Sequence, residues 1–176
     1  SLLQLAPPGQ FTKLGRATWP ELEPATEEYA VSIAASVAAH FLARDRAVGL
    51  ISTDDIAHSD MPDRGQRQLT RILERLAVTH AFGHVSLQAT LGREGQRVGG
   101  FDPVCSTTPS DEGAWLAAAQ NLTMRGIHVI AVLIDRSSFD DGTVSRNIGR
   151  AASAYRLPVC TIAKGQLPDE MYCQVA

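Results

Sequence analysis

Acidic and hydroxyl side chains follow the apolar segments of this sequence and are the first candidates for chemistry. These residues are Asp54, Asp55, Thr107, Thr108, Asp111 and Asp135. Gathered in one place, such oxygens could bind a hard divalent cation or the polar surface of a partner protein. Loops after strands are usually polar, and acids often begin the next helix, so a solvated edge is the plain alternative.

Other residue patterns give weaker signals for chemistry. His80 and His84 have the spacing of two helical zinc ligands, but Gly83 interrupts them and no third ligand is evident. The glycine-rich run over 92–100 does not follow a predicted strand and lacks the Gly-Lys-Ser/Thr ending of a phosphate loop. No Gly-x-Ser-x-Gly motif marks a hydrolase nucleophile. We therefore expect both segments to be connections.

The three cysteines, Cys105, Cys160 and Cys173, are widely spaced and odd in number. A small disulfide-based scaffold would have a denser and even set, so free thiols in a reducing compartment are expected. Cys105 and Cys160 lie within apolar runs that read as strands. The pattern predicts that both are buried, unpaired and inert.

Composition indicates one ordinary globular domain over residues 1–176. The chain is 44% hydrophobic and 20% charged, with a formal net charge of -3. Such a charge gives no global field for nucleic acid. No apolar run approaches the roughly 20 residues that span a bilayer, so this segment is not expected to insert into a membrane. Because the chain starts at Ser1 with an already apolar run, we expect a fragment of a longer protein.

Apolar periodicity predicts the elements that must position these residues. Helices are expected over 26–44, 66–79, 85–98 and 143–156, with a further helix capped by Ser110 and ended by Gly126. Strands are expected over 1–5, 47–53, 102–107, 127–134 and 159–163. Residues 6–26, rich in proline and glycine, read as a long connection, and 54–65 as a loop with room for a short edge strand.

The alternation of strands and helices predicts a three-layer α/β fold with a mostly parallel sheet covered by helices on both faces. Crossover connections in such a sheet are right-handed. Ligands of these sheets bind outside the carboxyl ends of the strands. The six candidate residues should therefore meet at that rim.

Four segments, 27–36, 46–51, 62–69 and 122–129, together resemble the bacterial domain-of-unknown-function family 58. The resemblance covers roughly residues 25–172 and implies a von Willebrand factor A-like (Rossmann-like) fold. Members of that family are longer, commonly carry amino-terminal membrane helices, and often neighbour a gene for a MoxR-type AAA ATPase. The resemblance thus implies a soluble, cytoplasmic-facing domain of a membrane-tethered adaptor or scaffold.

The metal site of many von Willebrand factor A domains is degenerate here. Gln4 stands where the first aspartate is expected, and the segment 6–9 after it has no serine. The loop 83–86 has no threonine at the expected place, and Asp111 lies several residues late. We therefore expect neither a metal nor another cofactor.

These patterns favour a non-enzymatic protein-interaction module that docks its partner on the rim without a metal bridge. The partner suggested by the resemblance is a MoxR-type AAA ATPase. The alternative is an enzyme or a small-ligand-binding α/β domain that uses the crevice at the same strand ends. A deep pocket holding Thr107, Asp111 and Asp135 would favour that alternative, and a flat rim would favour docking.

Overall fold

The computed structural model describes residues 26–53, 57–79, 85–99, 102–110, 113–139, 146–166 and 172–174. The predicted strand over 1–5 and the predicted connection up to residue 25 lie outside these ranges. So do His80, His84 and three of the six candidate site residues, Asp54, Asp55 and Asp111.

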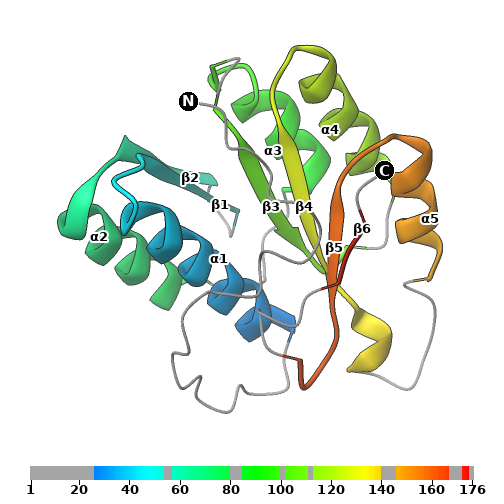
Figure 1. Cartoon of the computed structure of the whole chain (residues 1–176), viewed down its shortest axis with the longest axis horizontal. Helices are drawn as coiled ribbons and strands as arrows, with labels where there is room; N and C mark the ends of the chain where they lie inside the picture. The colour runs from blue at the N-terminus through cyan, green and yellow to red at the C-terminus, as the bar shows by residue number, and fades with distance from the viewer. Residues whose placement is uncertain are drawn as a thin grey trace.

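Helices and strands alternate along most of the described chain (Figure 1). The helices are α1 (Thr26–Leu42), α2 (Gly65–Ala77), α3 (Leu87–Glu94), α4 (Ala114–Met124) and α5 (Arg146–Ala154), with a short 3-10 turn, η2 (Arg136–Ser138). The strands are β1 (Val48–Thr53), β2 (Ala57–Asp63), β3 (Val104–Thr108), β4 (Val129–Ile134), β5 (Val159–Ile162) and β6 (Tyr172–Gln174). The five predicted helices and the last four predicted strands are therefore confirmed to within a few residues.

The described strands form two sheets. One has the order β3-β4-β5-β6, in which β3, β4 and β5 are parallel and β6 is antiparallel to β5. The other is the antiparallel pair β1-β2. A mixed α/β fold with a parallel sheet is confirmed, but the expectation of one mostly parallel sheet is wrong for the described strands. Only residues 54–56 separate β1 from β2, and a connection this short can join only antiparallel strands.

Helices cover both faces of the parallel strands. On one face, Ala131 and Leu133 of β4 pack against a cluster that includes Leu116 of α4 and Ile148 of α5. On the other face, Val132 and its neighbours pack against the first half of α1. Successive residues of β4 thus enter opposite cores, which explains why its sequence is apolar without alternation.

Helix α1 is shared between the two sheets. Tyr29 and Ile33, in its first half, contact the parallel sheet. Ala38 and Leu42, in its second half, pack with Ile72 of α2 in a third cluster above the β1-β2 pair. Figure 1 shows α1 running from the parallel sheet toward the hairpin and α2.

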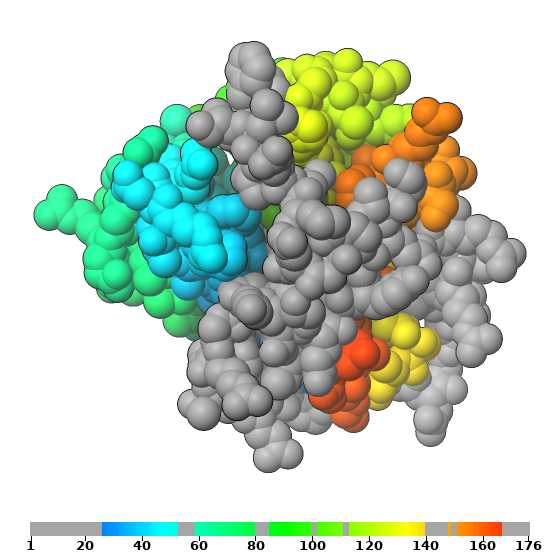
Figure 2. Space-filling view, viewed as in Figure 1, coloured from blue at the N-terminus to red at the C-terminus, as the bar shows by residue number. Residues whose placement is uncertain are grey.

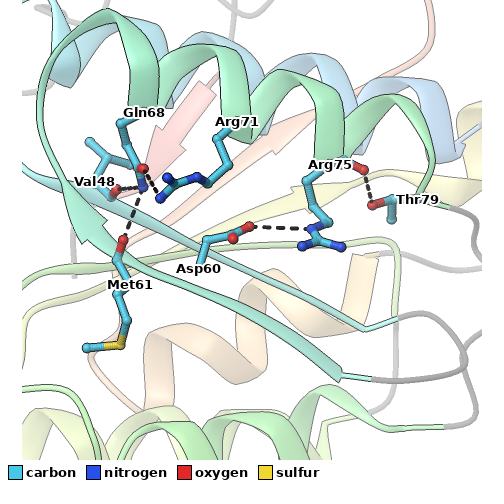
Figure 3. A network of polar contacts seen from close by, with 7 residues as sticks. All are labelled: Val48, Asp60, Met61, Gln68, Arg71, Arg75 and Thr79. Carbon is cyan, nitrogen blue, oxygen red and sulfur yellow. Dashed lines mark hydrogen bonds and ion pairs between the residues drawn. The ribbon is translucent and has the colours of Figure 1, made fainter.

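A buried glutamine fastens α2 to the hairpin (Figure 3). Gln68 is 1% exposed, and its Nε2 donates hydrogen bonds to the carbonyls of Val48 (2.8 Å) and Met61 (3.1 Å). Two turns further along α2, Arg75 Nε contacts Asp60 Oδ2 at 3.4 Å. These contacts fix the position of α2 relative to both strands.

The structure allows only glycine where α3 meets α4. A Cβ atom on Gly95 would lie 2.4 Å from Leu122 Cδ2 and 2.3 Å from the carbonyl oxygen of Leu91. The carbonyl of Gly95 accepts a hydrogen bond of 2.9 Å from Arg125 Nη1. This close approach holds α3 against α4 behind β3.

No helix in the described part of the chain is both long and apolar enough to cross a bilayer.

Candidate functional site

The carboxyl ends of β3, β4 and β5 meet at one edge of the sheet. Thr108 pairs in register with Leu133, and Ile134 pairs with Ile162. The N–H of Asp135 donates to the carbonyl of Ile162 at 2.8 Å, so the next residue continues the alignment. We use the name carboxyl rim for the described residues 107–110, 135–139 and 163–166, which end or follow these strands.

Asp135 shapes the turn after β4. Its Oδ1 accepts hydrogen bonds from the backbone N–H of Ser137 (3.0 Å) and from the Ser137 hydroxyl (2.6 Å). The hydroxyl of Ser138 donates to the carbonyl of Asp135 at 2.6 Å. The carboxylate therefore acts as the N-cap of η2.

The turn after β5 is fastened to the turn after β4 and to α1. The N–H of Lys164 donates to Ser138 Oγ at 2.8 Å, and the N–H of Gly165 donates to Tyr29 Oη at 2.6 Å. The Tyr29 ring packs edge-on against Phe139, with centroids 5.0 Å apart. Gly165 has a φ of 82°, which a residue without Cβ adopts at low cost.

The described part of the rim carries one carboxylate and two cations. Asp135 is half-buried and engaged, whereas Arg136 and Lys164 are exposed. In Figure 2 the yellow atoms that follow β4 and the red-orange atoms that follow β5 lie together at the surface. The described rim therefore presents cations from two turns that are hydrogen-bonded to each other.

The predicted threonines have different surroundings. Thr107 is half-buried, whereas Thr108 is buried and its Oγ1 accepts a 3.0 Å hydrogen bond from the N–H of Ser110. Ser110 was predicted to cap α4, but that helix has Gly113 as its N-cap, so this prediction is wrong. The structure thus brings Thr107, Thr108 and Asp135 to one edge, with Thr108 and Asp135 holding turns.

The described residues contain no group of three or more His, Cys, Asp or Glu side chains placed to hold a metal ion. Within the described ranges, two side chains have a clearly shifted pKa. Desolvation, followed by the nearby Arg44 charge, lowers the pKa of His40 on α1. Desolvation raises the pKa of the Cys105 thiol to about 11.

Both cysteine predictions need correction. Cys105 is a free thiol, as expected, but it is exposed rather than buried. The alternation of β3 accounts for this, because Ser106 and Thr108 point to the buried face of the strand and Cys105 points to the opposite face. Cys160 is buried as expected, but it is disulfide-bonded rather than free.

The part of the rim that is built from distant residues has no signal in the sequence. Tyr29 and Gly165 are 136 positions apart, and only the folded chain brings them together. The Lys-Gly pair directly after the last predicted strand was the one local signal for the second turn.

Comparison with known proteins identifies no relative. No family model, curated protein or solved structure matches the chain.

Proposed function

We propose that this domain is a non-enzymatic protein-interaction module of a longer bacterial protein and that its carboxyl rim docks the partner. The partner we propose is a MoxR-type AAA ATPase, in line with the resemblance to family 58. Within that family, the domain would be the von Willebrand factor A-like part of a membrane-tethered scaffold.

The observation that supports this proposal is that the turn after β5 is hydrogen-bonded both to the turn after β4 and to α1. Hydrogen bonds join Lys164 to Ser138 and Gly165 to Tyr29, so both turns are held before any partner arrives. A preformed surface loses little conformational entropy on binding. The exposed charges of Arg136 and Lys164 would complement an acidic patch on the partner.

Polar atoms of the rim already accept hydrogen bonds within the protein, and this favours docking over catalysis. Thr108 Oγ1 and Asp135 Oδ1, the oxygens most suited to chemistry at this edge, already accept backbone hydrogen bonds. A general base or a metal ligand would need such an oxygen directed toward a substrate or ion.

A charge reversal at the rim tests the proposal. The wild-type protein and the double variant Arg136→Glu/Lys164→Glu are titrated against the purified MoxR-type ATPase of the same organism. We expect the Kd of the double variant to rise by about tenfold or more, because two exposed charges at an interface change sign.

The matched control is Arg67→Glu, which reverses an exposed charge on α2, away from the rim. This variant should bind like the wild type. Equal Kd values for the rim variant and the wild type would overturn the docking surface. Absence of any wild-type binding would overturn the choice of partner.

A further inference from the structure

The end of the parallel sheet opposite the carboxyl rim is basic. Helices α3 and α4 both end there, because Gly95 at the end of α3 lies against Leu122 near the end of α4. Helix α5 ends there too, since β5 begins beside the start of β4. In Figure 1 the turns from α4 into β4 and from α5 into β5 lie at the end of the sheet away from the yellow η2 turn. We use the name amino end for the described residues 93–99, 102–103, 123–128 and 155–158.

Three arginine side chains of the amino end gather on two adjacent residues. Arg93 Nε contacts Glu94 Oε1 at 3.0 Å, and Arg97 Nη1 contacts Glu94 Oε2 at 3.1 Å. Arg125 Nη1 donates to the carbonyl of Gly95 at 2.9 Å. The Glu94 side chain is 8% exposed, whereas those of Arg93 and Arg97 are 56% and 62% exposed. The carboxylate of this cluster is therefore buried, and the charge that meets solvent is positive.

A fourth arginine stands where the neighbouring helix has a glycine. Helices α4 and α5 end in the same turn, in which the N–H groups of Ile127 and Leu157 each donate to the carbonyl five residues earlier, at 3.1 and 3.2 Å. The left-handed position of this turn is Gly126 after α4, with a φ of 86°, and Arg156 after α5, with a φ of 54°. Glycine adopts this conformation at lower cost than arginine. The exposed Arg156 thus adds a cation at a position where backbone energy favours glycine.

An exposed apolar side chain lies next to these cations. Met124, directly before Arg125 at the end of α4, is 72% exposed. Among the described residues of the amino end, the exposed carboxylate is that of Asp102 alone, against four exposed arginines. Arginines near helix C-termini interact favourably with the helix dipole, but the dipole gives no reason for an exposed methionine. Cations beside an exposed apolar side chain are typical of proteins that lie on anionic bilayers.

We propose that the amino end docks on the surface of an anionic lipid bilayer. The arginines lie against the lipid phosphates, and Met124 enters the headgroup layer without any helix crossing the membrane. The chain as a whole has a formal net charge of -3, so attraction to the bilayer acts on this end and orients the molecule. The inference does not rest on the proposed function. It leaves the carboxyl rim, at the opposite end of the sheet, facing away from the membrane.

Sedimentation of the purified protein with lipid vesicles tests the docking. Vesicles of phosphatidylglycerol and phosphatidylcholine in equal parts should bind the protein, and vesicles of phosphatidylcholine alone should not. Binding should weaken as the salt concentration rises from about 0.05 M to about 0.3 M, because salt screens the arginine charges. Equal binding to both kinds of vesicle, or binding to neither, would overturn the proposal. Binding to a polyglutamate peptide without binding to the anionic vesicles would indicate an acidic protein partner and would also overturn it.

A matched pair of variants locates the surface. Met124→Ser/Arg156→Gly removes one exposed apolar side chain and one cation from the amino end, and glycine suits the φ of 54° at position 156, so the protein should still fold. Its partition onto the anionic vesicles should fall by about tenfold. The control, Val78→Ser/Arg67→Gln, makes the same kind of change at exposed positions of α2 and its C-cap, and it should bind like the wild type. Equal losses in the two variants, or no loss in the first, would show that the amino end is not the docking surface.

Discussion

Asp135 has a structural role in the rim. Its carboxylate accepts two hydrogen bonds from Ser137 and caps η2, so it contributes to stability as well as to the surface. We predict that Asp135→Ala lowers the free energy of unfolding by about 1 kcal/mol, the usual effect of losing an N-cap. Asp135→Asn keeps an acceptor oxygen and should lose less. Urea unfolding of the three proteins measures this, and an unchanged midpoint for Asp135→Ala would show that the cap is dispensable.

Cys105 is open to solvent but surrounded closely enough that desolvation raises its pKa to about 11. Reagents can reach the thiol, yet its thiolate fraction at pH 7 is only about one in ten thousand. We predict slow labelling by a disulfide reagent at pH 7 and a rate that rises about tenfold per pH unit up to pH 10.

The comparison for Cys105 is a model thiol with the ordinary pKa of 9.0, which should react about a hundredfold faster at pH 7. Equal rates would mean that the pKa is not raised. The raised pKa also makes the free energy of unfolding depend on pH. The unfolded chain loses this proton first, so the contribution of Cys105 to stability is present below pH 9 and is lost as pH rises toward 11.

At the level of elements, Gln68 connects α2 to both strands of the hairpin. Gln68→Leu would keep the side chain's bulk but leave the carbonyls of Val48 and Met61 without this donor. We predict a loss of about 1–3 kcal/mol in unfolding free energy, the range for a buried group left unsatisfied. Arg67→Leu, at an exposed position one residue earlier, should change stability by less than about 0.5 kcal/mol. Similar effects from both variants in chemical denaturation would contradict this role.

Replacing each of two glycines near α3 by alanine should change stability in opposite directions. A Cβ on Gly92 would meet nothing within 4 Å, so Gly92→Ala should stabilise α3 by about 0.5–1 kcal/mol. Gly95→Ala would clash with Leu122 and Leu91, and overpacking of this kind costs about 1–3 kcal/mol. Thermal melting of the pair tests the contrast, and two shifts of the same sign would be inconsistent with this packing.

The sequence predicts elements best where apolar spacing is regular. The run 127–134 predicts β4 because its residues are buried on both faces. For β2 the sequence predicts only room for a short edge strand within a loop, because the segment is polar, contains Pro62 and has no apolar alternation. The three residues of β6 are too few for any periodic signal.

The site was predictable only where it is local. Asp135 directly follows a strongly apolar strand, so its place at the rim could be inferred from order alone. Its role as a cap depends on the dihedral angles of the turn, which order does not specify. The hydrogen bond from Gly165 in the turn after β5 to Tyr29 depends on where α1 packs, and that is a tertiary property.

Over the whole molecule, α1 joins the two sheets by contributing one half to each core. We predict that Ile33→Ala and Leu42→Ala each destabilise both parts by about 2–5 kcal/mol, the range for a core truncation. In a Trp19→Phe background, Trp115 fluorescence reports the parallel-sheet part, and hydrogen exchange at Ile72 reports the α2 part. Both probes should give the same unfolding free energy. Two separate values would show that the hairpin with α2 unfolds independently.

The structure of β2 also bears on how the protein behaves when many copies are crowded together. Among the described strands β2 pairs only with β1, so it is an edge at which a second chain could add a strand. Pro62 offers that chain no N–H, and Gln68 already occupies the carbonyl of Met61. The exposed Asp63 adds like charge to any copy that approaches in the same way. The contact that fastens α2 internally therefore also discourages stacking of one copy on another and helps to keep this edge out of aggregates.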